Sequence, residues 1–245
     1  GSAASVLLRQ AGQTDYVYAM AGDSVAKYAA GSWDKVDEVS LPAAACSGSS
    51  LAVVDNALVA VMQTGQIAMM SEDLDIAWVS DAPALPQGAA AWGAASQVVA
   101  DGGSVYVALL ALDQQGAPVS CEVISAASID GGLFWQTSLG VDGAAAMIDG
   151  VCAGGSGKAA SPSLMYVDNT LVVAPGDSML SAIDPASAKA TSSLQLDGAI
   201  LGRMALAPAG MTGLADGGPV LVVGTSAPTV YMVTFEHYNY FETSE

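Results

Sequence analysis

Two unrelated stretches of this chain return further along it at nearly the same spacing. The segment VVDNALVAV at residues 53–61 reappears as YVDNTLVVA at residues 166–174, which is 113 residues later. The segment ADGGSVYVA at residues 100–108 reappears as ADGGPVLVV at residues 215–223, which is 115 residues later. Two such repeats indicate an internally duplicated chain, and a duplicated chain builds its fold from one recurring structural unit.

The recurring unit is clearest in residues 161–196. Short apolar runs there alternate with turn residues, which is typical of strands joined by tight turns. The turns are expected at Asp168-Asn169, at residues 175–177 and at Asp184-Pro185, because Asp, Asn, Gly and Pro favour turn geometry. The strands are expected at residues 164–167, 170–174, 179–183 and 190–196. One unit is therefore predicted to be a four-stranded antiparallel sheet.

The same order of strands and turns fits five units. They cover residues 5–42, 50–83, 97–140, 161–197 and 204–245, with an Ala/Gly/Ser-rich insertion at residues 141–160. A single four-stranded sheet cannot bury both of its faces, whereas sheets arranged radially cover one another. We therefore predict one all-β domain over residues 1–245, a β-propeller of five four-stranded blades. A propeller of six or more blades and a pair of β-sandwiches are the alternatives.

Three tryptophans fall in or at the edge of the last strand of their units, namely Trp33, Trp78 and Trp135. Their rings are expected to fill space between neighbouring sheets near the rim. The fourth unit has no tryptophan there.

The fourth unit resembles the repeat of pyrroloquinoline-quinone-type propellers. The matching residues, in order, are Ser161-Pro162, Val167-Asp168-Asn169, Leu171-Val172-Val173, Gly176-Asp177, Ala182-Ile183-Asp184 and Lys189. The resemblance implies a propeller fold. It does not imply the quinone cofactor, because many members of this broad group do not bind it, and no cofactor is expected here.

The charge balance limits the classes of partner. The chain has 24 acidic and 6 basic residues, a net charge of −18, which repels phosphate backbones and anionic membranes. Its apolar runs are shorter than the roughly 18 residues of a membrane-spanning helix. We expect no nucleic acid and no membrane insertion of this segment, and a protein or a carbohydrate as partner. The shortage of Lys and the abundance of small residues favour an extracellular or cell-surface location.

The sequence shows no catalytic set, and no catalytic residue is assigned. His237 is the only histidine, and GGSGK at residues 154–158 has Cys152 and Ala159 where a phosphate loop needs Gly and Ser or Thr. Aspartates are expected at equivalent turns before the second strands: Asp15, Asp55, Asp101, Asp168 and Asp216. They recur because those turns favour Asp, so they are not interpreted as an acid/base pair.

A few residues remain as candidates for binding. Glu72, Asp73 and Asp75 are candidate metal ligands, although a charged hairpin tip also explains them. Trp92, in an expected loop at residues 89–95, is a candidate contact aromatic, and so are Tyr238 and Tyr240. The odd number of cysteines, Cys46, Cys121 and Cys152, leaves two alternatives, one disulfide with one thiol or three thiols.

The function predicted from the sequence is that of a non-catalytic, exported or cell-surface propeller that binds or scaffolds other molecules. One alternative is a carbohydrate-active enzyme that uses acidic residues at the propeller channel. It requires carboxylates a few ångströms apart beside an aromatic platform. The other alternative is a quinone-dependent oxidoreductase domain.

Overall fold

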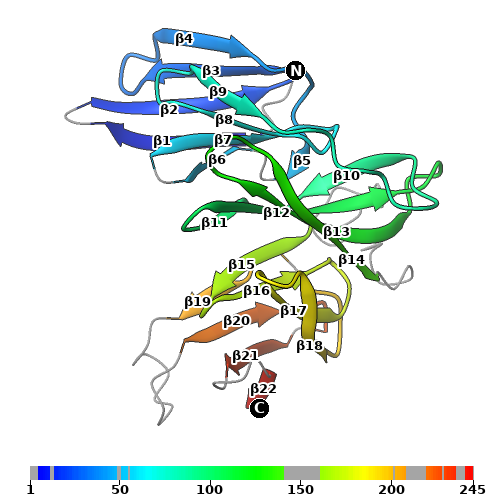
Figure 1. Cartoon of the computed structure of the whole chain (residues 1–245). Helices are drawn as coiled ribbons and strands as arrows, with labels where there is room; N and C mark the ends of the chain where they lie inside the picture. The colour runs from blue at the N-terminus through cyan, green and yellow to red at the C-terminus, as the bar shows by residue number, and fades with distance from the viewer. Residues whose placement is uncertain are drawn as a thin grey trace.

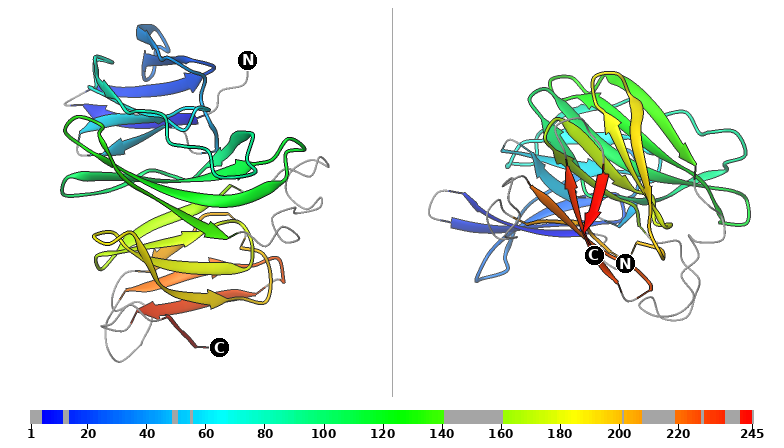
Figure 2. Two further views of the ribbon diagram at one scale, coloured as in Figure 1. Left: turned by 45° about the vertical axis from the view of Figure 1, so that its right-hand side comes forward. Right: turned by 90° about the horizontal axis from the view of Figure 1, so that it is seen from below.

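A computed structural model describes residues 5–11, 14–48, 51–54, 56–140, 161–200, 202–207, 219–227, 229–235 and 241–244 of the chain. All regular secondary structure in these residues is β-strand, and the strands form five sheets. The sheets follow one another in chain order, with the first in blue and the fifth in orange and red at opposite ends of the stack (Figures 1 and 2). The all-β prediction is confirmed.

The first two sheets are simple meanders in which each strand pairs with the next in antiparallel fashion. The first contains β1 (Ser5–Ala11), β2 (Thr14–Ala21), β3 (Ser24–Ala29) and β4 (Lys35–Ser40). The second contains β6 (Leu51–Val54), β7 (Ala57–Val61), β8 (Ile67–Met70) and β9 (Ile76–Val79).

The fourth and fifth sheets have the same order. The fourth contains β15 (Ser163–Val167), β16 (Thr170–Ala174), β17 (Met179–Asp184) and β18 (Lys189–Gln195). The fifth contains β19 (Ala205–Ala207), β20 (Val220–Gly224), β21 (Val230–Phe235) and β22 (Phe241–Ser244). The turn predicted at Asp168-Asn169 has positive φ at both residues, 46° and 59°, as a two-residue hairpin turn that matches strand twist requires.

The third sheet has six strands rather than the four expected. β12 (Ser104–Leu112), β13 (Pro118–Ala127) and β14 (Leu133–Gly140) form its meander, and the short β11 (Val99–Asp101) pairs with the first part of β12. β12 is longer than β11 can cover, so β10 (Ala91–Ala95) pairs with its remainder, and β5 (Ser47–Gly48) adds in parallel to β10. The loop predicted at residues 89–95 is therefore wrong.

Four hydrophobic clusters hold the stack together, one at each junction between consecutive sheets. Tyr18 and Met20 of the first sheet pack with Leu58 and Met70 of the second. The next three clusters join the second sheet to the third, the third to the fourth and the fourth to the fifth. Strand β16 is buried at every position, because both faces of its sheet are covered. Each sheet is thus stabilised by its neighbours rather than by itself.

The ring is open in this structure. None of the four clusters of described residues joins the first sheet to the fifth. Leu8, on the face of the first sheet turned away from the second, is 68% exposed, and Val230 of the fifth sheet is also exposed. Five sheets are present among the described residues, but their closure into a five-bladed ring stays a prediction.

Two of the three tryptophans have the predicted packing role. Trp78 of β9 donates its indole N–H to the carbonyl of Ser128, in the turn between the third and fourth strands of the next sheet, at 3.0 Å. Trp135 of β14 makes the corresponding bond to Pro185, also at 3.0 Å. Trp33 does not match the prediction. It lies in the turn before β4 with φ of 63° and is 66% exposed, so it fills no space between sheets.

Candidate functional site

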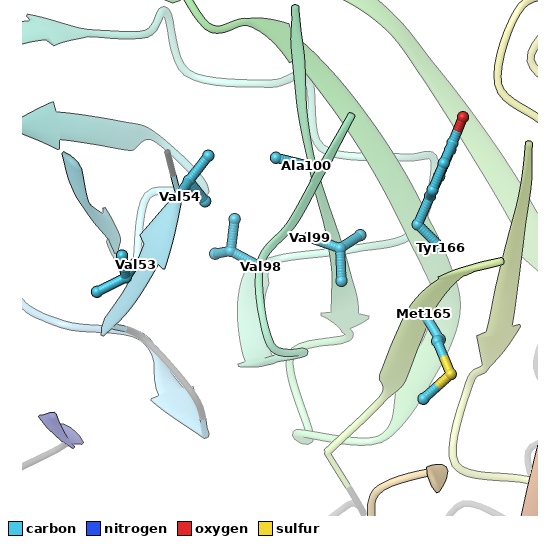
Figure 3. Close-up of a pocket in the computed structure, with 7 residues that line it drawn as sticks. All are labelled: Val53, Val54, Val98, Val99, Ala100, Met165 and Tyr166. Carbon is cyan, nitrogen blue, oxygen red and sulfur yellow. The ribbon is translucent and has the colours of Figure 1, made fainter. Parts of the chain in front are cut away.

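The first strands of the second, third and fourth sheets surround a groove of about 400 Å³ that is open to solvent (Figure 3). Its lining is mostly apolar: Val53 and Val54 from β6, Val98 with Val99 and Ala100 of β11, and Met165 and Tyr166 from β15. None of these seven residues is acidic. A groove of this size falls within the roughly 300–1,000 Å³ of typical ligand sites.

The repeated segments of the sequence place these residues at equivalent positions. In each of these three sheets, the last residue of the first strand flanks the turn into the second strand. The residue just before that last residue is Val53, Ala100 or Tyr166. The flanking pairs Val54/Ala57, Asp101/Ser104 and Val167/Thr170 each enclose two residues. In a hairpin with a two-residue turn, the pair that flanks the turn is expected to be hydrogen-bonded. Hydrogen-bonded and non-hydrogen-bonded pairs alternate along antiparallel strands. The residue before each flanking residue, which is Val53, Ala100 or Tyr166, therefore points its N–H and C=O away from the second strand. These backbone groups therefore face the groove.

A polar cluster borders the apolar groove beside Tyr166. The Tyr166 hydroxyl donates to Oδ2 of Asp101 across 2.5 Å, and Oδ1 of Asn169 lies 3.2 Å from the same hydroxyl. A hydroxyl has one hydrogen, so it donates to only one of these two acceptors at a time, and Asp101 Oδ2 is the nearer. Burial, together with the hydrogen bond and the charge of Asp101, raises the pKa of Tyr166 above its usual value. Tyr166 therefore stays neutral and acts as a hydrogen-bond donor to Asp101.

The ring of Tyr166 is supported from the third sheet. It stacks on Tyr106, with ring centres 6.1 Å apart and an interplanar angle of 10°. Tyr106 in turn contacts Trp135, with 5.9 Å between ring centres. The side chain at the edge of the groove is thus fixed by an aromatic row that continues into the junction between sheets.

Ion pairs join the first two sheets. Arg9 Nε lies 2.5 Å from Oε1 of Glu72, and Arg9 Nη2 donates to Oδ1 of Asn56 at 2.9 Å. Lys27 Nζ lies 2.7 Å from Oδ1 of Asp73 and 4.4 Å above the centre of the Tyr16 ring. Two of the three candidate metal ligands, Glu72 and Asp73, are thus paired with cations.

No group of three or more His, Cys, Asp or Glu residues is arranged to hold a metal ion in the part of the chain that the structure describes. Asp75 is exposed at the same turn, where its N–H donates to Ser71 Oγ at 3.2 Å. The metal role of Glu72, Asp73 and Asp75 stays a prediction.

Of the candidate contact aromatics, Trp92 is the one that lies within the described residues, and it is not among the residues that line the groove. Trp92 lies in β10, is 8% exposed and belongs to the core between the second and third sheets. Its role as a contact residue stays a prediction. Tyr238 and Tyr240 lie outside the described residues, as do His237, the segment 154–158 and the whole insertion at residues 141–160.

The expected equivalence of the turn aspartates holds only in part. Asp168 lies in its turn and Asp101 at the end of β11, but Asp15 lies inside β2, where it pairs with Gln10. Asp55 and Asp216 are outside the described residues. At the polar cluster, Asp101 is the carboxylate that accepts the Tyr166 hydrogen bond, and the seven residues that line the described groove include no carboxylate.

Two of the three cysteines are buried free thiols. Cys46 donates from Sγ to the carbonyl of Gly93 at 2.9 Å, and burial raises its pKa to about 12. Burial also raises the pKa of Cys121. These two are not joined by a disulfide, and Cys152 lies outside the described residues.

Sequence reasoning did not identify the groove, although its signal was present. The repeats VVDN at residues 53–56, YVDN at residues 166–169 and ADGG at residues 100–103 contain four of the seven lining residues. The repeats in the sequence indicate the structural unit of the fold. They do not indicate that three of these units line one groove, which only the coordinates show.

Comparisons with known proteins identify the fold. No protein family and no curated protein matches the sequence. Among similar solved structures, europium-containing methanol dehydrogenase has a TM-score of 0.64 at 14% identity, over 97% of this chain and 51% of that one. BBS1N in complex with ARL6DN has a TM-score of 0.60 at 13% identity, over 100% of this chain and 67% of that one. BamB from Moraxella catarrhalis has a TM-score of 0.52 at 13% identity, over 99% of this chain and 76% of that one.

These structures are propeller proteins, so the likeness places this chain in a propeller-type architecture. The chain spans about half the length of the methanol dehydrogenase and about two thirds of BBS1N. At such low identity the likeness shows the fold alone. In the described residues there is no helix of the length and apolarity needed to cross a membrane.

Proposed function

We propose that this chain is a non-catalytic binding module, a five-bladed β-propeller whose groove takes part of a partner protein. The observation that carries the proposal is the groove itself. Its walls are apolar, and its equivalent strands direct the backbone of Val53, Ala100 and Tyr166 toward it. Apolar walls with a few placed polar groups are what a binding site needs.

Two further observations support a binding role. The described lining contains no acidic pair, and the one carboxylate beside it, that of Asp101, accepts a hydrogen bond from Tyr166. One of the similar solved structures is that of BBS1N in complex with ARL6DN. We propose by analogy that this chain also acts through a protein partner, and we do not carry over the activity of the dehydrogenase. The acidic, lysine-poor composition supports a location outside the cell or at its surface.

Site-specific photo-crosslinking tests the proposal. We place a benzophenone amino acid at Val99 in the groove, and as a matched control at Ile129, which is 87% exposed in the turn before β14. The partner should be captured from the source cells or their medium by the Val99 variant and not by the Ile129 variant. Equal capture from both positions would show that the groove is not the binding site. Turnover of glycosides or alcohols by the purified chain would contradict the non-catalytic part.

A further inference from the structure

We infer that the ligand of the groove is an extended, basic and apolar polypeptide segment that lies along β11 as an added strand and pairs a cationic side chain with Asp101. This inference rests on the proposed function of the groove as the binding site. It adds the conformation, the polarity and the charge of the segment that is bound.

The backbone groups at the groove favour an extended segment. β11 pairs with β12 on one side only, and the alternation of the ladder turns the N–H and C=O of Ala100 toward the groove. The strands β6 and β15, which line the groove on either side of β11, are also edge strands of their sheets. An extended peptide satisfies such strand edges by strand addition, which a compact ligand cannot do.

The side chains favour alternating apolar residues in the bound segment. Val99 of β11 and Met165 of β15 are half-buried, and Val53 of β6 is exposed, so apolar surface is available on both sides of the added strand. An extended peptide presents every second side chain to the same face. Covering these three residues removes apolar area from water and stabilises the complex.

The charge of the site favours a basic segment. Asp101 is exposed at the turn that ends β11, and Asp168 is exposed in the equivalent turn after β15. The whole chain carries a net charge of −18, and among the described residues Arg9, Lys27 and Lys35 are in ion pairs with its own carboxylates. An acidic segment would be repelled, whereas a basic one is attracted during approach and held at Asp101.

The side chain of Tyr166 argues against a sugar as the occupant. A sugar site needs an open aromatic face, but one face of the Tyr166 ring is stacked on Tyr106 and its hydroxyl is bonded to Asp101. Tyr166 is the only aromatic residue among the seven that line the described groove.

The probe is the hexapeptide Lys-Val-Thr-Val-Lys-Val-amide with fluorescein attached to its N-terminus, so that both lysine side chains keep their charge, and binding is measured by fluorescence anisotropy at low salt. Two matched peptides accompany it, one with Glu in place of Lys and one with N-methyl groups on alternate backbone amides. The basic peptide should bind, and each of the other two should bind about tenfold more weakly or worse. The N-methylated peptide keeps the charge and the side chains, so its loss isolates backbone pairing.

Two variants of the protein locate the peptide. Ala100→Pro removes the N–H that faces the groove and leaves the β11–β12 ladder intact, because Pro is tolerated where the N–H of an edge strand is unpaired by the sheet. It should weaken binding by roughly threefold to tenfold without lowering the melting temperature. Asp101→Asn keeps an acceptor for Tyr166 but loses the charge, and should weaken binding by a similar factor. Asp130→Asn, in the turn before β14, is the control and should bind as the wild type does.

The inference is overturned if the basic peptide does not bind, if the Glu or the N-methylated peptide binds equally well, or if an oligosaccharide binds in its place. It is also overturned if Ala100→Pro and Asp101→Asn bind the peptide as tightly as Asp130→Asn. Capture of a partner from Val99 would still support the proposed function in each of these cases. Loss of that capture, with peptide binding intact, would instead contradict the protein partner of the proposed function and leave the groove as a site for an extended peptide.

Discussion

The indole of Trp78 lies directly against Gly131, so closely that a Cβ at residue 131 would stand 2.4 Å from Cε3 of the ring. The same indole donates its N–H to Ser128, in the turn that contains Gly131. The second sheet is thus held to the third by a hydrogen bond and by packing of the indole against the backbone of Gly131, which has no side chain. At the following junction Trp135 bonds to Pro185, and Ala188 takes the position of Gly131.

Gly131→Ala should therefore destabilise the fold by about 2 to 5 kcal/mol. Positive φ costs an L-residue about 1–2 kcal/mol, and overpacking against a buried ring adds about 1–3 kcal/mol. Urea unfolding measures the loss. The control is Gly102→Ala, which has positive φ but no atom within 4 Å of the new Cβ, and should lose only the backbone contribution. Equal losses in the two variants would show that the Trp78 contact adds nothing.

Ala188→Gly should stabilise the chain by about 0.5–1 kcal/mol. Ala188 has φ of 59°, and glycine relieves about 1–2 kcal/mol of backbone strain there, offset in part by the larger entropy of the unfolded chain. The measurement is the urea midpoint at constant m-value. Ala186→Gly, in the same turn without positive φ, should lose a few tenths of a kcal/mol or more. A loss at residue 188 would contradict the assignment of strain.

Arg9→Met should destabilise the junction between the first and second sheets by about 1–3 kcal/mol, because Glu72 loses its ion-pair partner and Asn56 its donor. The matched control is Lys35→Met. It breaks the exposed pair Lys35–Glu38 and should leave the free energy of unfolding nearly unchanged. Similar losses for both would mean that the Arg9 contact behaves as an ordinary surface pair.

Native Cys46 and Cys121 should be inert to a thiol reagent near pH 8. The reacting species is the thiolate, and burial raises the pKa of Cys46 to about 12 and that of Cys121 as well, so both thiols are protonated throughout the neutral range. We use a Cys152→Ser variant so that only these two thiols are counted. The folded protein should show no fast reaction and the urea-unfolded protein two thiols. Fewer than two without a reductant would indicate a disulfide.

Leu8→Lys tests whether the ring closes. Leu8 is exposed on the free face of the first sheet, so a lysine there should change the free energy of unfolding by about 0.5 kcal/mol at most. Leu58→Lys, at a fully buried position between the first and second sheets, should prevent folding. A large loss for Leu8→Lys would show that the fifth sheet, or another one, covers this face in solution.

Much of the strand pattern follows from local chemistry. Strand β16 begins and ends at the predicted residues because Asp168 and Asn169 favour the left-handed conformations of a two-residue turn. The error at Trp33 is also local. The N–H of Trp33 bonds to the carbonyl of Ala29, so the turn before β4 is long enough to include the tryptophan. Pattern alone does not reveal that β4 begins only at Lys35.

The amino-acid sequence by itself determined the repeated unit of strands, the turns between them and the continuous apolar runs that make both sheet faces apolar, because each of these depends on residues close together in the chain. Only the tertiary structure decided which units meet. The convergence of Val53, Ala100 and Tyr166 on one groove, the pairing of Arg9 with Glu72 and the addition of β10 beside β11 all join distant segments. Such contacts depend on how the side chains between neighbouring sheets pack, which involves residues far apart in the sequence.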